Sequence, residues 1–205
     1  MDMRRHEFSV EDWQEAEAFL AEASFGVLAT TGPDGWPGAT PINFVFLKDN
    51  LYIHGSRAGQ KMEDIKEDNR VSFSIAKEYA IIPSYFTDPV YACPASAFFK
   101  SVCIKGKAYL VDDPAEKAEA MEAFMRKLQP EGGYEPITPE GYGSRLTSVA
   151  VVRIEPEDWS AKFKFGQNMG GEQRQHVMSE LVKRDLPDDK ETARLMELYC
   201  PVHKK

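Results

Sequence analysis

The sequence predicts a mainly β protein, an antiparallel barrel with flanking helices. Three predicted strands follow one another through short turns between residues 25 and 54. Strands and helices do not alternate regularly along the rest of the chain, which argues against a parallel sheet. No period of about 20 to 50 residues repeats, and this excludes solenoids and propellers.

The first part of the chain supplies a helix and these three strands. Ser9 to Asp12 forms a capping box before apolar residues at helical spacing, which predicts a helix over residues 10–22. Apolar runs predict strands over residues 25–30, 36–47 and 51–54. Because proline cannot donate a ladder hydrogen bond, we expect Pro41 to lie at a sheet edge or bulge.

The second part adds strands separated by helices. Periodicity predicts, in order, a helix at 59–67, a strand at 71–75, a strand or bent strand pair at 98–111, a helix from 114 to the residue before Pro130, a strand at 147–154, and helices at 172–184 and 189–199. Residues 79–96 and 132–143 are rich in Pro, Tyr or Gly and are predicted to be irregular. Asp113 is expected to cap the helix that begins at Pro114, and Gly106 to kink its strand.

Composition excludes several classes of function. The 205 residues carry 25 Lys and Arg against 33 Asp and Glu, a net charge of −8, so the chain has no global field for nucleic acid. The most apolar long stretch, residues 79–99, contains three prolines and could not cross a membrane as a helix. Three cysteines without C-x-x-C spacing, and no apolar signal segment, indicate a soluble, cytoplasmic protein in a reducing compartment.

The histidines do not indicate a metal site. His6, His176 and His203 lie near the termini or in the polar tail, and no H-x-x-x-H or H-x-x-E pair exists. No catalytic metal is therefore expected. His54, at the end of an apolar strand, is by itself more typical of a hydrogen-bonded structural residue than of a ligand or acid–base group.

The strongest local signal runs from His54 to Lys61. A strand passes into a turn containing Gly55, Ser56 and Arg57, and Lys61 lies on the first turn of the next helix. Hydroxyl, guanidinium and ammonium groups beside free backbone amides are typical of a phosphate site. The spacing is not that of a Walker loop, and a solvated turn with ordinary surface charges is the competing interpretation.

These residues, taken with others, resemble a known family: the pyridoxamine 5′-phosphate oxidase-like, FMN-binding split barrels, and within it the nitroimidazole-resistance branch. The resemblance covers about residues 1–165. It is carried by residues 24–30, 32–35, 40–45, 52–56, 59–65, 99–102 and 106–108. It implies a six-stranded Greek-key split barrel over residues 1–165. Residues 166–205 have no counterpart in the family and, from the two helices predicted there, are expected to form a helical extension.

The resemblance also implies a site. In a homodimer, two FMN molecules would lie in grooves between the subunits, with FAD as the alternative flavin. Ser56, Arg57 and Lys61 would hold the phosphate. The residues implied beside the ring or ribityl chain are Thr40, Pro41, Ile42 and Asn43, then His54 and Gly55, and, from the segment that reaches the flavin edge, Lys100, Ser101 and Val102.

The sequence departs from the oxidase proper at its substrate contacts. Gly38 has no side chain where that enzyme has an arginine, and Lys162 and Lys164 replace its Arg-x-His ending. Vitamin B6 oxidation is therefore not expected.

The expected function is that of an FMN-dependent oxidoreductase. It would reduce a small electron-poor molecule, such as a nitroaromatic or a quinone, with NAD(P)H as the electron donor, and no catalytic side chain is assigned because the flavin carries the chemistry. The alternative is a non-enzymatic flavin- or haem-binding protein of the same fold, in which His54 would be the axial ligand.

Overall fold

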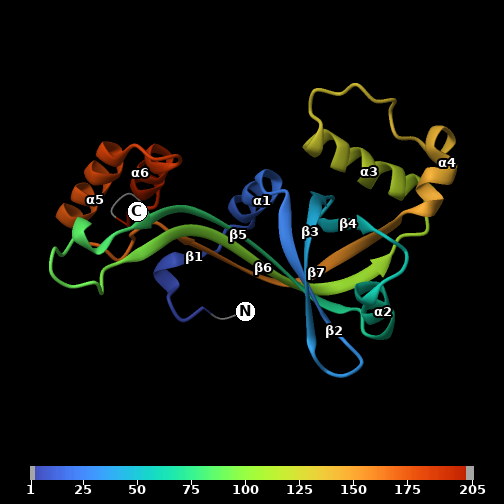
Figure 1. Ribbon diagram of the computed structural model, residues 1–205, viewed down its shortest axis with the longest axis horizontal. Helices are drawn as coiled ribbons and strands as arrows, with labels where there is room; N and C mark the ends of the chain where they lie inside the picture. Colours follow the sequence, from blue (N-terminus) through green and yellow to red (C-terminus); the bar gives the residue numbers. More distant parts are fainter. Residues whose placement is uncertain (1–2, 202–205) are drawn as a thin grey trace. The chain divides into compact units, whose positions relative to one another are not determined.

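The computed structural model describes residues 3–201 (Figure 1). The elements, in chain order, are η1 (His6–Phe8), β1 (Ser9–Val10), α1 (Trp13–Glu22), β2 (Phe25–Thr31), β3 (Pro37–Leu47), β4 (Asn50–Gly55), α2 (Gln60–Glu67), β5 (Arg70–Ile82), η2 (Ser84–Phe86), β6 (Ser96–Leu110), α3 (Pro114–Leu128), α4 (Pro139–Ser148), β7 (Ala150–Lys164), α5 (Gly171–Arg184) and α6 (Asp189–Leu198).

Six strands close into a ring. The sheet order is β1-β7-β4-β3-β2-β5-β6, and β7 also pairs with β6, so β2 to β7 form a barrel and the short β1 is an additional strand on β7. The β2–β3, β3–β4, β2–β5, β4–β7 and β1–β7 pairs are antiparallel. Because β5 returns beside β2 after the run β2-β3-β4, the topology is a Greek key. The predicted split-barrel class is confirmed.

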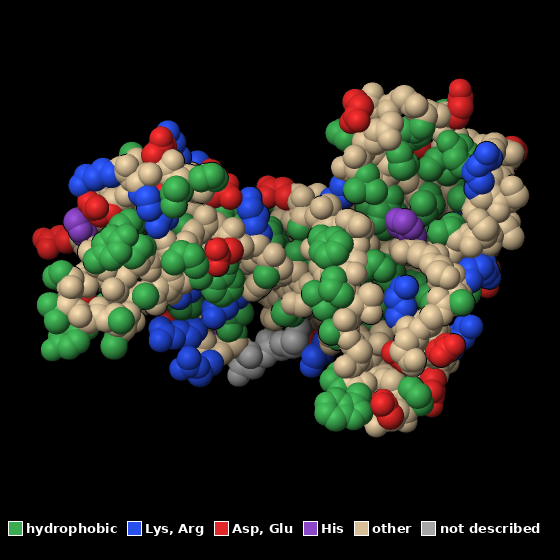
Figure 2. Space-filling model, viewed as in Figure 1, with side chains coloured by type: hydrophobic (Ala, Val, Ile, Leu, Met, Phe, Trp, Pro, Cys, Tyr) green, Lys and Arg blue, Asp and Glu red, His purple; other side chains and the backbone are tan. Residues whose placement is uncertain are grey.

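The chain divides into two compact units. The barrel unit holds Trp13–Ile75 and Val102–Trp159, and the tail unit holds Ala76–Ser101 with the described residues before 13 and after 159. The units do not follow the expected boundary at residue 165, because residues 76–101 group with the C-terminal helices. Figure 2 shows side chains of both charge signs on the surface of each unit.

Alternating burial along the strands builds the barrel core. The fully buried side chains of this core include Leu28, Phe44, Leu51, Ile53, Phe73, Ile75, Val102, Ile104 and Ile154. The rings of Phe44 and Phe73 meet edge to face at 5.2 Å. A Cβ on Gly26 would lie 2.4 Å from the Phe73 ring, so glycine is what lets that ring approach β2.

A second core fills the tail unit. Phe165 stacks on Tyr199 at 5.5 Å and meets Tyr79 and Phe98 edge to face. Helices α5 and α6 pack side by side over it (Figure 1). Arg184, on α5, makes an ion pair with the buried Asp189 of α6 at 2.6 Å, which fixes the two helices to each other.

Several predicted element bounds need correction. Ser9 and Val10 pair with β7, so α1 begins at Trp13 rather than at residue 10. Strands β5 and β7 continue to Ile82 and Lys164, well past the predicted ends at 75 and 154. Residues 139–148 form α4, capped by Thr138, where an irregular segment and a strand start were predicted. The cap by Asp113 is confirmed, since its side chain accepts from the Glu116 amide at 2.9 Å.

Pro41 has the environment that the sequence predicts. It pairs with Val27 of β2, whereas the pairing of β3 with β4 starts only at Phe44. At Pro41, the edge of β3 that faces away from β2 therefore has no partner in β4. Proline, which has no N–H, can lie there without the loss of a hydrogen bond between β3 and β4.

No helix in residues 3–201 is long and apolar enough to cross a membrane.

Candidate functional site

The turn between β4 and α2 brings a lysine back over the end of the strand. The Lys61 Nζ atom lies 3.4 Å from the position that a Cβ on Gly55 would take. Gly59, with φ of +119°, makes the sharp entry into α2 that other residues rarely adopt. A side chain at residue 55 would crowd the ammonium group, so the two glycines create an open corner beside Lys61.

This corner has the donors that an anion requires. Within residues 3–201, the half-buried Lys61 makes no hydrogen bond or ion pair. Gly59 is the N-cap of α2 and offers no side chain to the first amides of the helix. Free amides and the helix dipole at this end attract negative charge. The residues present therefore fit a phosphate group.

A buried carboxylate fixes the helix that carries Lys61. Asp64 is 2% exposed and accepts from Thr30 Oγ1 on β2 at 2.6 Å and from Gln60 Nε2 at 2.7 Å. These two hydrogen bonds lower the pKa of Asp64. Asp64 thereby holds the first turn of α2 against the barrel, which makes it a positioning residue for Lys61.

Ser56 and Arg57 are exposed and already have partners. Ser56 Oγ accepts from the Ala58 amide at 3.1 Å, and Arg57 Nη1 donates to the Thr147 carbonyl of α4 at 3.1 Å. Both keep further donors, since a hydroxyl can still donate and a guanidinium has five N–H groups. They lie in the predicted turn, but Lys61 alone of the three predicted phosphate ligands is unpaired within the described chain.

The predicted ring-side residues lie where β3 and β4 diverge. The last pair of these strands is Phe44 with Ile53, so Asn43 and His54 are the next residues of each strand. Thr40, Ile42 and Asn43 are half-buried, and Pro41 is exposed. Asn43 Nδ2 donates to the Ser24 carbonyl at 3.0 Å. The structure thus brings the β3 and β4 candidates to one end of the barrel.

His54 packs against α3. Its ring meets the Phe124 ring edge to face at 4.6 Å, and burial lowers the pKa of His54. The neutral imidazole is therefore the favoured form at neutral pH.

This shift predicts a pH dependence of stability. The folded state holds the His54 proton less tightly than the unfolded chain, whose histidines titrate near pH 6.5. The contribution of His54 to the free energy of unfolding is therefore complete above about pH 6.5. It is lost as the pH falls from about 6.5 toward and through the lower pKa of the folded state. Urea unfolding at pH values across this window measures the effect. As the pH falls, the free energy of unfolding should decrease less in His54→Gln than in the wild type. His176→Gln, on an exposed position of α5, should keep the decrease.

Sequence reasoning missed Lys127 of α3. Its Nζ donates to the carbonyls of Leu20 and Ala23 and lies 4.7 Å from the Phe44 ring centroid. Burial lowers the pKa of Lys127. The one available signal was its position three residues after Phe124, which places the two side chains on the same side of a helix.

The remaining candidates lie on β6. Lys100 and Ser101 belong to the tail unit, where the Lys100 ammonium lies 5.0 Å from the Phe163 ring centroid and Ser101 Oγ donates to the Lys162 carbonyl at 3.5 Å. Val102 belongs to the barrel unit and is fully buried in its core. Only its backbone could therefore contact a ligand.

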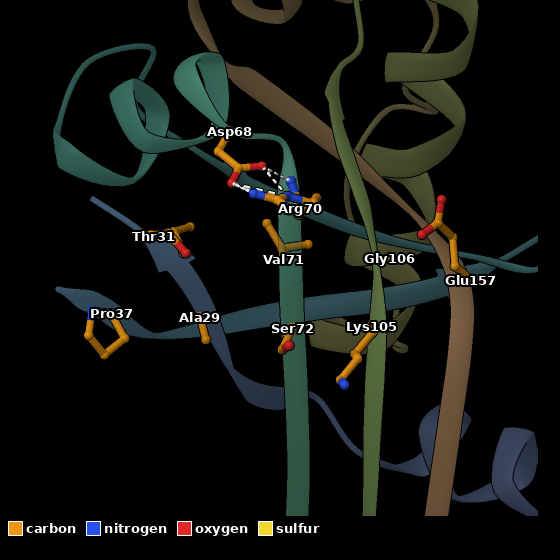
Figure 3. A pocket seen from close by; sticks show the side chains of 11 residues that line it. Ala29, Thr31, Pro37, Asp68, Arg70, Val71, Ser72, Lys105, Gly106 and Glu157 are labelled. Atoms are coloured by element: carbon orange, nitrogen blue, oxygen red, sulfur yellow. Dashed lines mark hydrogen bonds and ion pairs between the residues drawn. The ribbon is translucent and has the colours of Figure 1, made fainter. Parts of the chain in front are cut away.

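A cavity of about 550 Å³ elsewhere on the barrel contains none of the predicted residues (Figure 3). Its charged groups are largely paired with each other or with neighbours. Arg70 binds Asp68 through two nitrogens at 2.5 to 3.1 Å, which lowers the pKa of Asp68 to about 2, and Glu157 pairs with Lys107 at 2.8 Å. The corner at Lys61 is the better candidate for an anionic ligand.

Within residues 3–201, no three His, Cys, Asp or Glu side chains come together as a metal site would require.

Comparison with known proteins agrees with the fold. The sequence profile of the family described as pyridoxamine 5′-phosphate oxidase matches residues 12–163. The protease synthase and sporulation protein PAI 2 of Bacillus subtilis is 27% identical over 200 residues, which is 93% of this chain and 94% of that protein.

Two solved structures share the fold. The flavocytochrome Anf3 from Azotobacter vinelandii superposes with a TM-score of 0.67 at 22% identity, over 80% of this chain and 72% of that one. A protein provisionally named for 5-nitroimidazole antibiotic resistance, from Bacteroides thetaiotaomicron, gives 0.61 at 22% identity, over 75% and 85%.

Proposed function

The chain belongs to the pyridoxamine 5′-phosphate oxidase family, and from this premise we propose that it is a flavin-dependent oxidoreductase that binds FMN. The observation that carries the proposal is the unpaired Lys61 beside Gly55 and the uncapped start of α2. This corner suits the terminal phosphate of FMN, with further donors from Ser56 and Arg57. FAD, whose phosphates lie inside the molecule, suits it less well.

The flavin supplies the hydride and one-electron chemistry when it is bound, so the chain has to bind and orient it. Lys61 and the α2 amides neutralise the phosphate. Thr40 to Asn43, on the free edge of β3, offer backbone groups to the polar side of the ring, and His54 contributes a neutral imidazole at the same end of the barrel.

A homodimer is part of the proposal. The outer face of β2 and β3 exposes Phe25 and Val27, at 54% and 37%, with Ala29, Ala39 and Pro41 beside them. Apolar and small side chains on a flat sheet face are typical of a subunit interface. In such a dimer, Lys100, Ser101 and the Val102 backbone of one chain would approach the flavin of the other.

The proposed substrate is a small electron-poor molecule, a nitroaromatic or a quinone, with NAD(P)H as donor. Vitamin B6 oxidation is not proposed. A Cβ on Gly38 would lie 2.8 Å from Thr30 Oγ1 and 3.4 Å from Asp64 Oδ2. The buried pair that positions α2 thus leaves no room for a substrate-binding arginine at residue 38.

An absorption spectrum of the purified protein tests the cofactor. We expect the two visible flavin bands, and turnover of NADH or NADPH with a nitroimidazole or a quinone should follow. Flavin bands without turnover on either panel would favour the alternative, a flavin-binding protein without catalysis. A Soret band would instead favour a haem protein with His54 as ligand. A spectrum with neither flavin bands nor a Soret band would contradict the proposal.

A further inference from the structure

The tail unit contains a buried arginine without a carboxylate partner in the described chain. Arg174, at the start of α5, is 3% exposed. Its Nη2 atom donates to the carbonyls of Gly166 and Met169 at 3.1 Å each, and to that of Gln167 at 3.5 Å. Its Nη1 atom donates to Cys200 Sγ at 2.6 Å. Within residues 3–201, no Asp or Glu pairs with this guanidinium, so carbonyl dipoles and one sulfur atom compensate its charge.

The same guanidinium has a donor without an acceptor. Arg174 Nε is buried and makes no hydrogen bond with any residue that the structure describes. Buried charges are normally paired and buried donors normally satisfied, because either defect costs free energy. A thiol sulfur is only a weak acceptor. Of the groups that contact Arg174, the Cys200 sulfur is the one that can be converted to a stronger acceptor, since an oxygen atom can be added to it.

Cys200 is the least exposed of the three cysteines and the one that contacts a cation. It follows α6, where its amide donates to the Glu197 carbonyl at 3.1 Å, and it is 7% exposed. Cys93 is exposed and Cys103 is half-exposed, and in residues 3–201 neither sulfur accepts a hydrogen bond from a basic side chain. Buried cysteines in apolar surroundings are inert, whereas a neighbouring arginine activates a thiol. Exposure and activation thus predict opposite orders of reactivity for these cysteines.

We propose that Cys200 is a site of oxidation by small hydroperoxides and that Arg174 activates it. With hydrogen peroxide, the sulfur attacks one oxygen, the S–O bond forms as the O–O bond breaks, and the departing hydroxide takes the thiol proton and leaves as water. Sulfur loses two electrons and becomes a sulfenic acid, while the peroxide is reduced. Arg174 stabilises the negative charge that develops on oxygen, and the oxygen bound to sulfur supplies the acceptor that Nε lacks. The step uses none of the residues of the proposed flavin site and does not depend on that function.

Oxidation of the reduced full chain, followed cysteine by cysteine, tests the proposal. The folded protein is treated with hydrogen peroxide for graded times, and catalase then removes the peroxide. Unfolding with dimedone and iodoacetamide labels sulfenic acids and remaining thiols, and peptide mass spectrometry locates the labels. Cys200 should be oxidised at least about tenfold faster than Cys93 or Cys103, the effect of one charge-assisted contact on a barrier. In concentrated urea, where Arg174 is no longer held against the sulfur, the three rates should become equal.

Arg174→Gln removes the charge. It should lower the Cys200 rate by at least about tenfold and leave the Cys93 rate unchanged as an internal control. Arg194→Gln is the matched control, because it makes the same change of charge on α6, at a side chain that is 60% exposed. It should oxidise Cys200 at the wild-type rate. If Arg174→Gln does not fold, the comparison of the three cysteines in folded and unfolded wild type still decides.

The proposal is wrong if the folded wild type oxidises Cys93 or Cys103 as fast as Cys200, or if the preference for Cys200 persists in urea. It is equally wrong if Arg174→Gln, folded by circular dichroism, keeps the wild-type Cys200 rate, or if Arg194→Gln loses as much.

Discussion

Replacement of Lys61 by glutamate is expected to abolish flavin retention. The substitution removes the one predicted phosphate ligand that is unpaired in the described chain and places a carboxylate beside Gly55. A lost charge-assisted contact costs about 1.5 to 3 kcal/mol, and repulsion between the carboxylate and the phosphate adds to it. Affinity should therefore fall by about 100-fold or more. The flavin-to-protein ratio after gel filtration measures the effect.

Lys66→Glu is the matched control for this experiment. Lys66 lies on the same helix, is exposed, and undergoes the same change of charge. It should retain flavin at the wild-type ratio. If Lys61→Glu also retained flavin at that ratio, the phosphate would have to bind elsewhere, even if the protein remained a flavoprotein.

The corner at Lys61 could be predicted from the sequence because it is local. Its glycines, its lysine and the helix start lie within seven consecutive residues, from Gly55 to Lys61, and each has a conformational or chemical preference that the sequence shows directly. The same holds for the strand that ends at His54 and for the cap at Asp113.

Contacts between distant segments could not be predicted in this way. Arg57 donates to the Thr147 carbonyl, 90 residues away along the chain. Lys127 donates to the carbonyls of Leu20 and Ala23, which are 107 and 104 residues away. No periodicity reports such pairs. The length of β5 was missed because Lys77 and Glu78 interrupt its alternation. In the structure, the continuation of β5 is held from outside by Arg184, which donates to the Ile81 carbonyl at 2.8 Å.

Gly106→Ala is expected to destabilise the fold severely. The sequence predicts a kink here, whereas the structure shows a continuous β6 in which Gly106 is buried against β7. An added Cβ would lie 2.1 Å from the Glu155 carbonyl oxygen and 3.2 Å from the Pro156 Cα. Both neighbours are backbone atoms and cannot rotate away, so β6 and β7 would have to separate where they close the barrel.

We expect a loss of about 3 kcal/mol in the free energy of unfolding, at the upper end for overpacking, and a decrease of roughly 6 to 12 °C in Tm for a chain of this size. Gly143→Ala is the control, because no atom lies within 4 Å of the new Cβ and the residue is inside α4. That substitution should raise stability by up to about 1 kcal/mol through helix propensity. Thermal unfolding followed by circular dichroism measures the Tm of both variants, which should fall in Gly106→Ala and not in Gly143→Ala. An unchanged Tm in Gly106→Ala would mean that β6 and β7 are not in close backbone contact at this position, and the ring of strands would then be open there.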